Sequence, residues 1–243
     1  MAYDSASDSD LSEFGPAAVA LATIKLKMTH GDGQVILPAA NFLKNIQNRY
    51  NSAFSDFTIK SDRGMLYNVH RHIITNHSRY FARLCHGDFQ EAKSRIVTLH
   101  DDPPQAVQLM VEFFHTFDYN ADSTYIHGND TTKPAVLVLH AMVFTIADKY
   151  EIPDLKTHAL RKLQAKANER VADYAEFASG PCAQLVAYVY THAPPHDDSL
   201  QRAAVGLWTR ANNDLVHHTS KGDMERLVSE YPVFGADLIK QMA

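Results

Sequence analysis

Five side chains that commonly bind metals or act as nucleophiles lie close together in residues 69–87, VHRHIITNHSRYFARLCHG. They are His70, His72, His77, His86 and Cys85, which is one of only two cysteines in the chain. Imidazoles and thiolates are preferred zinc ligands, and a cysteine beside a histidine could form a nucleophilic pair. The stretch could therefore be a metal site, a catalytic pair or an ordinary part of a folded domain.

The elements expected around these residues separate their side chains. The preceding stretch, DFTIKSDRGMLYNVH, alternates apolar and polar residues on either side of the turn residues 62–64. This pattern predicts two strands, the second of which ends at His70. We expect a single helix to follow through about residue 86. His72 and His77 would lie five residues apart on that helix, so their directions would differ by about 140°.

We therefore expect no metal, cofactor or catalytic residue in this chain, and we expect that it is not an enzyme. No Cys-x-x-Cys pair is present to complete a tetrahedral site. Cys85 and His86 are neighbours on the expected helix and would not face each other. The sequence has no Gly-x-Ser-x-Gly motif, and the Gly31–Gly33 turn is too short for a phosphate-binding loop. We interpret Cys85 as a small core residue and His70 as a hydrogen-bonded residue of the fold.

Composition excludes several other classes of function. Of the 243 residues, 45% are hydrophobic and 21% are charged, as in an ordinary globular protein. The net charge is -5 and no dense run of Lys or Arg is present, which argues against direct binding to nucleic acid. No apolar stretch reaches the ~18 residues of a membrane span. With two distant cysteines and no secretory signal, we expect a nuclear or cytoplasmic protein.

The remaining patterns divide the chain into segments. Residues 1–16 are rich in Ser, Asp and Ala, which predicts a disordered tail, and residues 17–50 form an extension with an expected strand and helix. A third strand is expected at RIVTLH. The helix after it should begin with Asp102 as N-cap, Pro103 at the first helical position and Gln105 in a capping box.

The later part of the chain is expected to be helical. A polar loop over residues 120–133 precedes AVLVLHAMVFTIADKY, a helix that is apolar nearly all round and so belongs in the centre of a domain. Another helix should start at Pro153. Short amphipathic segments then follow, among them ADYAEFA, PCAQLVAYVY and DMERLVSEY.

The order strand, strand, helix, strand and helices carries a residue signature. Its members are Asp56-Phe57, Val69-His70-Arg71, Ile73-Ile74, Ser78, Tyr80-Phe81, Leu99, Asp102-Pro103 and the helix that leads to Tyr119. The signature resembles the BTB/POZ domain over residues 51–163, and VLVLHAMVFTIADKYEIPDLKTHA is similar to the Leu- and Ala-rich helix of that family. The short helical C-terminal region with no further recognised module resembles the fungal members, whereas the Kelch repeats, zinc fingers or MATH domain that often accompany the family are not recognised. The loop at residues 120–133 is longer than the family's usual connection.

The resemblance implies both a fold and a function. We expect an α/β class with the BTB/POZ fold, a small sheet of at least three strands capped by helices, over residues 51–163. An all-helical region over residues 164–243, loosely like a BACK region, should follow. The implied function is a protein–protein interaction module that forms a homodimer and links an unidentified client to a cullin scaffold of a ubiquitin ligase. The alternative is a BTB scaffold of a transcription or chromatin-associated complex without a ligase role.

The resemblance also assigns candidate interface residues. Asp56 and Arg71 match a charged pair in a groove at the family's dimer interface, although they could equally form an intrachain salt bridge. Phe89 and Glu91 match the hydrophobic-x-Glu motif of BTB adaptors that bind cullins, but the phenylalanine could instead cap the core. The expected strand ATIKLKM could be exchanged between the two copies of a dimer or could cover its own domain.

Overall fold

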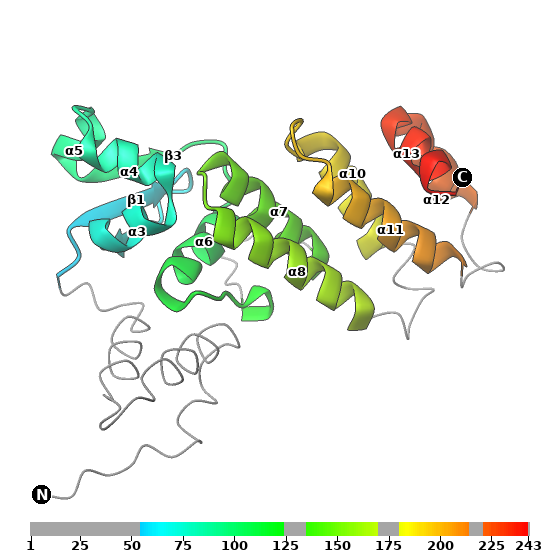
Figure 1. Cartoon of the computed structure of the whole chain (residues 1–243), viewed down its shortest axis with the longest axis horizontal. Helices are drawn as coiled ribbons and strands as arrows, with labels where there is room; N and C mark the ends of the chain where they lie inside the picture. Colours follow the sequence, from blue (N-terminus) through cyan, green and yellow to red (C-terminus); the bar gives the residue numbers. More distant parts are fainter. Residues whose placement is uncertain (1–53, 124–134, 170–179, 214–220, 243) are drawn as a thin grey trace, which may run out of the picture. The chain divides into compact units, whose positions relative to one another are not determined.

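The computed structural model describes residues 54–123, 135–169, 180–213 and 221–242 (Figure 1). By its contacts, the chain separates into two compact units, unit 1 over residues 1–120 and unit 2 over residues 121–243. The predicted tail, the N-terminal extension and the expected ADYAEFA helix all lie outside the described residues. The predicted boundary between residues 163 and 164 stays a prediction.

Unit 1 is built on a three-stranded sheet. The strands are β1 (Phe57–Ser61), β2 (Leu66–Val69) and β3 (Ile96–Leu99), in the order β2-β1-β3. β1 pairs with β2 in antiparallel fashion and with β3 in parallel fashion. The hairpin turn contains Gly64 at a φ of 81°, a left-handed conformation that favours glycine. The strand–turn–strand prediction is therefore confirmed.

The two faces of this sheet have different characters, as the alternation in the sequence predicts. Phe57, Ile59, Val69, Val97 and Leu99 are buried on one face. On the opposite face the register places Lys60 between Leu66 and Thr98, and Thr58 between Asn68 and Ile96. Leu66 is 61% exposed and Ile96 is 46% exposed. Unit 1 thus buries one side of its sheet and leaves apolar side chains on the other.

The expected single helix after β2 is in fact two helices, α3 (Arg71–His77) and α4 (Arg79–His86). Ser78 separates them, because its backbone is extended, with φ of -133° and ψ of 124°. Its hydroxyl accepts a hydrogen bond from the Phe81 backbone N–H at 3.0 Å, which caps the start of α4. The prediction of one continuous helix was wrong because this local cap competes with helix continuation.

Two further helices complete unit 1, α5 (Gln90–Ser94) and α6 (Pro104–Thr116). α6 begins one residue later than predicted, with Pro103 at the N-cap position and no side-chain cap, so the predicted Asp102 cap was wrong. Asp102 is instead buried. The predicted apolar stripe does form on α6, where Phe114 is fully buried and lies edge-on to Phe81 of α4, with ring centroids 5.8 Å apart.

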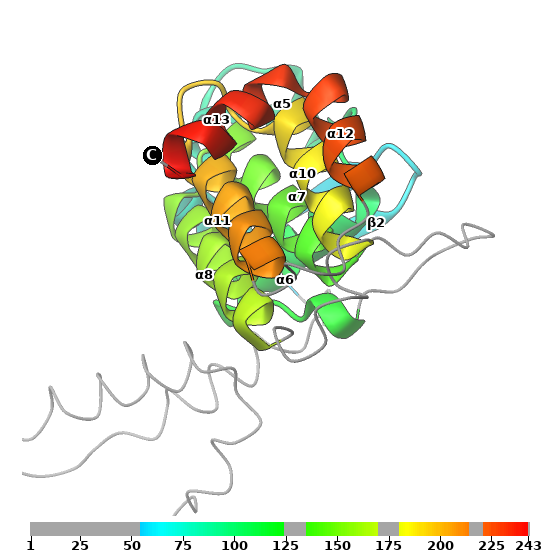
Figure 2. The ribbon, with the colours of Figure 1, turned by 90° about the vertical axis from the view of Figure 1, so that its right-hand side faces the viewer.

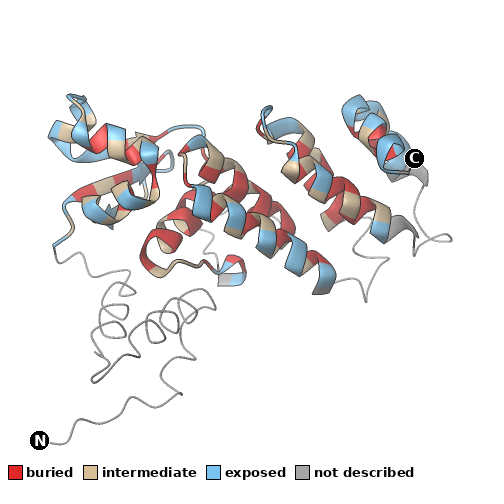
Figure 3. Cartoon of the chain, viewed as in Figure 1, coloured by how far each residue is buried: buried red, intermediate tan, exposed pale blue. Residues whose placement is uncertain are grey.

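Unit 2 is helical in its described part. Its elements are the 3-10 turn η2 (Ala121–Ser123), α7 (Val136–Lys149), α8 (Pro153–Glu169), α10 (Pro181–His192), α11 (Ser199–Asn213), α12 (Lys221–Glu230) and α13 (Pro232–Met242). α7 packs against α8 and α10, and α10 and α13 pack against α11, so these helices form a row (Figure 1), which Figure 2 views from the side of α12 and α13. Figure 3 shows α7 buried along most of its length, as its all-round apolar sequence predicts.

Aromatic side chains hold the C-terminal helices of unit 2 together. Trp208 of α11 is 1% exposed and lies edge-on to Phe234 of α13, with ring centroids 5.6 Å apart. Tyr190 of α10 also contacts Phe234, and its hydroxyl donates a hydrogen bond to Asp237 at 3.0 Å. With the sheet and helices of unit 1, this helical region confirms the predicted fold class.

Candidate interaction sites

Asp56 and Arg71 meet at the junction between β1 and α3. The Asp56 carboxylate accepts a hydrogen bond from the Arg71 backbone N–H at 2.8 Å, so it binds the first turn of α3. The Arg71 guanidinium turns elsewhere and donates to the backbone carbonyl of Cys85 on α4. The two predicted residues are therefore brought together, but through the backbone of Arg71. The prediction that Asp56 and Arg71 lie at a dimer interface stays a prediction.

The histidines and the cysteine of residues 69–87 point into different surroundings. His77 packs against the rings of Phe113, Phe114 and Phe117, as expected of a partly buried residue. His70 lies edge-on to His115. Its backbone carbonyl accepts hydrogen bonds from the backbone N–H groups of Ile73 and Ile74, while its buried Nδ1 has no hydrogen-bond partner among the described residues. Among all the residues that the structure describes, no group of three or more His, Cys, Asp or Glu side chains is placed to hold a metal ion.

Cys85 is a buried core residue, as predicted, with 3% of its surface exposed. Burial raises the pKa of its thiol, although the nearby Arg71 guanidinium acts in the opposite direction. A raised pKa disfavours the thiolate that a nucleophile or a metal ligand requires. The geometry and the electrostatics of Cys85 therefore both fit a packing role.

Phe89 and Glu91 lie together at the corner between α4 and α5. Phe89 occupies the N-cap position of α5, and Glu91 lies in its first turn. The Phe89 side chain is 57% exposed, so it does not cap the core as the alternative interpretation required. The pKa of Tyr80 is raised first by burial and then by the nearby negative charges of Glu91 and Asp102.

Gly87 determines where the Phe89 ring can lie. A Cβ atom placed on Gly87 would come within 2.6 Å of two carbon atoms of that ring. The ring therefore rests directly over the glycine backbone, in a space that any other residue would fill. Sequence reasoning found Phe89 through its motif, but it did not find the role of Gly87. The result is an exposed aromatic side chain in a defined position beside a carboxylate.

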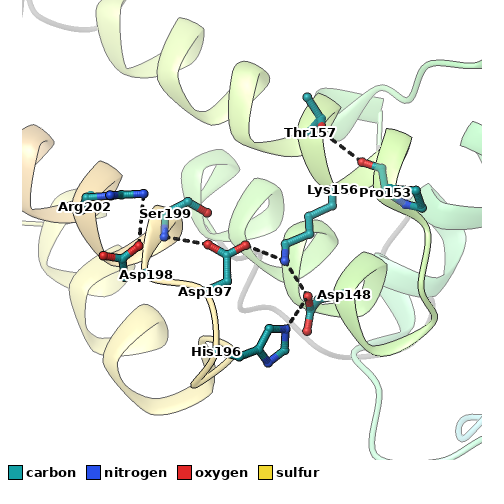
Figure 4. Close-up of polar contacts among 9 residues, drawn as sticks. All are labelled: Asp148, Pro153, Lys156, Thr157, His196, Asp197, Asp198, Ser199 and Arg202. Atoms are coloured by element: carbon teal, nitrogen blue, oxygen red, sulfur yellow. Dashed lines mark hydrogen bonds and ion pairs between the residues drawn. The ribbon is translucent and has the colours of Figure 1, made fainter.

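Unit 2 contains a charged network that sequence reasoning missed (Figure 4). Lys156 of α8 contacts Asp148 of α7 at 2.5 Å and Asp197, in the loop before α11, at 2.6 Å. Burial lowers the pKa of Lys156, but the hydrogen bonds that its ammonium group donates to both carboxylates outweigh this effect and raise the pKa. His196 lies 3.2 Å from Asp148. The network fastens α11 to the α7–α8 pair, and no local sequence pattern indicates such long-range pairing.

The comparison with protein families decides what kind of domain carries these sites. The family model described as BTB/POZ domain matches residues 45–167, about half of the chain. The chain belongs to the BTB/POZ domain family. The BTB/POZ match includes the whole predicted range 51–163 and all four candidate interface residues, Asp56, Arg71, Phe89 and Glu91. No curated protein matches the chain.

Membership of the BTB/POZ family identifies the protein as a protein–protein interaction module, since BTB domains commonly dimerise and bind partner proteins. The candidate sites on its described surface fit that function, because exposed aromatic and charged side chains are typical of binding surfaces. None of the helices in the described ranges is both long enough and apolar enough to cross a membrane.

Proposed function

We propose that this BTB/POZ protein self-associates and acts as an adaptor that links a client protein to a cullin scaffold of a ubiquitin ligase. The observation that carries the cullin part is the exposed Phe89 ring beside Glu91 at the start of α5. The mechanism is positioning, and no covalent chemistry is assigned to this chain. Self-association would raise the effective concentration of each bound partner near the other copy.

The Phe89 ring has enough exposed surface to act as a binding anchor. A phenylalanine side chain offers ~200 Å², and 57% of the Phe89 surface is exposed. Burying that exposed part against a partner would contribute about 2–3 kcal/mol, which corresponds to roughly 30- to 150-fold in affinity. Gly87 makes room for the ring in this position, because a Cβ atom at Gly87 would come within 2.6 Å of it.

The test is a binding titration of the full chain with a cullin scaffold protein. We expect Phe89→Ala and Glu91→Lys each to weaken binding at least tenfold, and Gly87→Ala to weaken it by displacing the ring. The matched control is Leu66→Ala, which removes an exposed apolar side chain from the outer face of the sheet in the same unit. Failure of the unaltered chain to bind the scaffold would refute the cullin role.

Several finer assignments belong to the same proposal. The C-terminal helices α10 to α13 would form a BACK-like region of a fungal-type BTB protein, in which the client is held. We place the protein in the nucleus or the cytoplasm. Asp56 and Arg71 would lie at the interface between two copies. Their intrachain contacts support this role only by fixing the junction of β1 and α3 in one conformation.

A further inference from the structure

A groove in unit 2 lies between α8 and α11 and has a volume of about 490 Å³. One wall consists of Leu160, Gln164 and Asn168 from α8, and the other includes Arg202, Gly206 and Arg210 from α11. Within each set the residues are four apart, so they lie on one face of their helix. The groove is therefore bounded by two ridges of side chains that run along the two helices.

The two helices run in the same direction along this groove. Near their N-terminal ends, Lys156 of α8 contacts Asp197, two residues before α11 begins. Near their C-terminal ends, the Arg210 guanidinium donates a hydrogen bond to Asn168 at 2.9 Å. Arg202 and Arg210 are eight residues apart on α11, which corresponds to a rise of about 12 Å. The two cations thus mark two separate points along the groove.

The groove carries positive charge. Its lining includes Arg202 and Arg210 but no aspartate or glutamate. Within the described part of the chain, the hydrogen bonds of Arg210 go to the Asn168 side chain and the Gly206 carbonyl, which are both uncharged. Arg202 pairs with Asp198 at 3.1 Å, but both side chains are about 70% exposed (Figure 4). Such an exposed pair is weak and can exchange for another carboxylate.

We propose that this groove binds an acidic peptide segment of a partner protein in an extended conformation. An extended chain advances about 3.4 Å per residue, so two carboxylates four residues apart would span the ~12 Å between the arginines. Residues four apart on a strand also point to the same side. Ala203 and Gly206 line the groove between the two arginines, so no long side chain of α11 stands at these two positions.

Nucleic acid fits the groove less well than an acidic peptide. Phosphate backbones are bound by extended basic surfaces, whereas Arg202 and Arg210 are the only lysine or arginine side chains in this lining. The whole chain also carries a net charge of -5. The inference goes beyond the cullin proposal, because Phe89 and Glu91 belong to unit 1 while the groove belongs to unit 2. Either one can therefore fail without the other.

The test uses the full chain and a fluorescein-labelled peptide, Gly-Asp-Ser-Ala-Ser-Asp-Gly, with fluorescence anisotropy as the readout. We expect binding that weakens as NaCl is raised and that is lost when both aspartates of the peptide are replaced by asparagine. Arg202→Glu and Arg210→Glu should each weaken binding about tenfold or more. Arg226→Glu on α12 is the matched control, because Arg226 is also an exposed arginine in an i,i+4 pair but does not line the groove.

Further variants keep the test decisive if an arginine variant folds poorly. Gln164→Glu changes an exposed residue of the α8 wall, so the fold should persist while the added charge weakens binding. The proposal is overturned if the peptide does not bind, or if all three groove substitutions leave its affinity unchanged. Tighter binding of a single-stranded oligonucleotide would also overturn it.

Residues 4–8 of the chain have the peptide's Asp-Ser-Ala-Ser-Asp sequence. If the labelled peptide binds only to the Asp4→Asn/Asp8→Asn double variant, the chain's own residues 4–8 would be the occupant of the groove. That result would overturn the proposal of a partner peptide.

Discussion

Lowering the pH is expected to destabilise unit 2 through His140. This residue lies on α7 and is 5% exposed. Burial lowers the pKa of its imidazole from 6.5 to about 4, and the positive charge of Lys162 on α8 adds to the effect. Lys166 and His158 also lower the pKa, whereas the Asp122 carboxylate opposes them. His140 is therefore uncharged in the folded protein at pH values where the unfolded chain already binds a proton.

The sign and size of the effect follow from this difference. Because the pKa is lower in the folded state, the contribution of His140 is fully present above about pH 6.5 and is lost as the pH falls toward 4. The complete shift corresponds to about 3 kcal/mol, of which about 2 kcal/mol should be lost between pH 7.5 and pH 5. The carboxyl pKa of Asp197 is lowered by its hydrogen bonds from Lys156 and Ser199, so its contribution is lost only at lower pH.

Urea denaturation measures this loss. Trp208 is the only tryptophan of the chain and is buried in unit 2, so its emission reports the unfolding of the unit that contains His140. The free energy of unfolding of the unaltered protein should fall by about 2 kcal/mol from pH 7.5 to pH 5. His140→Gln should remove most of that slope, and His86→Gln, at an exposed histidine, should keep it. Equal slopes in all three proteins would refute the reasoning.

Three further substitutions test contacts within each of the two units. Lys156→Met should destabilise unit 2 by about 1–3 kcal/mol, because it leaves two partly buried carboxylates without their cation, and urea denaturation followed by Trp208 emission will measure this. Ser78→Ala should cost about 1 kcal/mol by removing the cap on α4, which amide hydrogen exchange of unit 1 can detect. Trp208→Ala should cost about 3–5 kcal/mol and lower the melting temperature measured by circular dichroism, whereas Val233→Ala, at an exposed residue of α13, should change it little.

Local patterns predicted the strands and most of the helices of this fold. Alternation identified β1 and β2, and the turn at Gly64 identified the hairpin. The all-round apolar sequence of α7 correctly placed that helix in a core. The patterns failed where two local preferences competed. Ser78 fits a helical pattern, but its hydroxyl caps the next helix, and the start of α6 moved one residue beyond the predicted position.

The candidate sites could be predicted only in part, for a physical reason. The family signature led to Phe89 and Glu91, and the structure adds the exposure of the ring and its support by Gly87. The pairing of Lys156 with Asp197 joins residues 41 positions apart, and the groove joins α8 to α11. Such contacts depend on how helices pack in space, which the periodicity of either helix alone does not contain.

We propose that this BTB/POZ protein works by assembly with itself and with partner proteins. Sedimentation velocity of the full chain across micromolar concentrations tests it most directly. We predict a species with twice the mass of one chain, which Arg71→Glu should shift toward the monomer while Arg79→Glu, at an exposed arginine of α4, should leave it unchanged. Circular dichroism would confirm that both variants remain folded. A monomer at every concentration, or a dimer equally stable in both variants, would contradict self-association through the junction of β1 and α3.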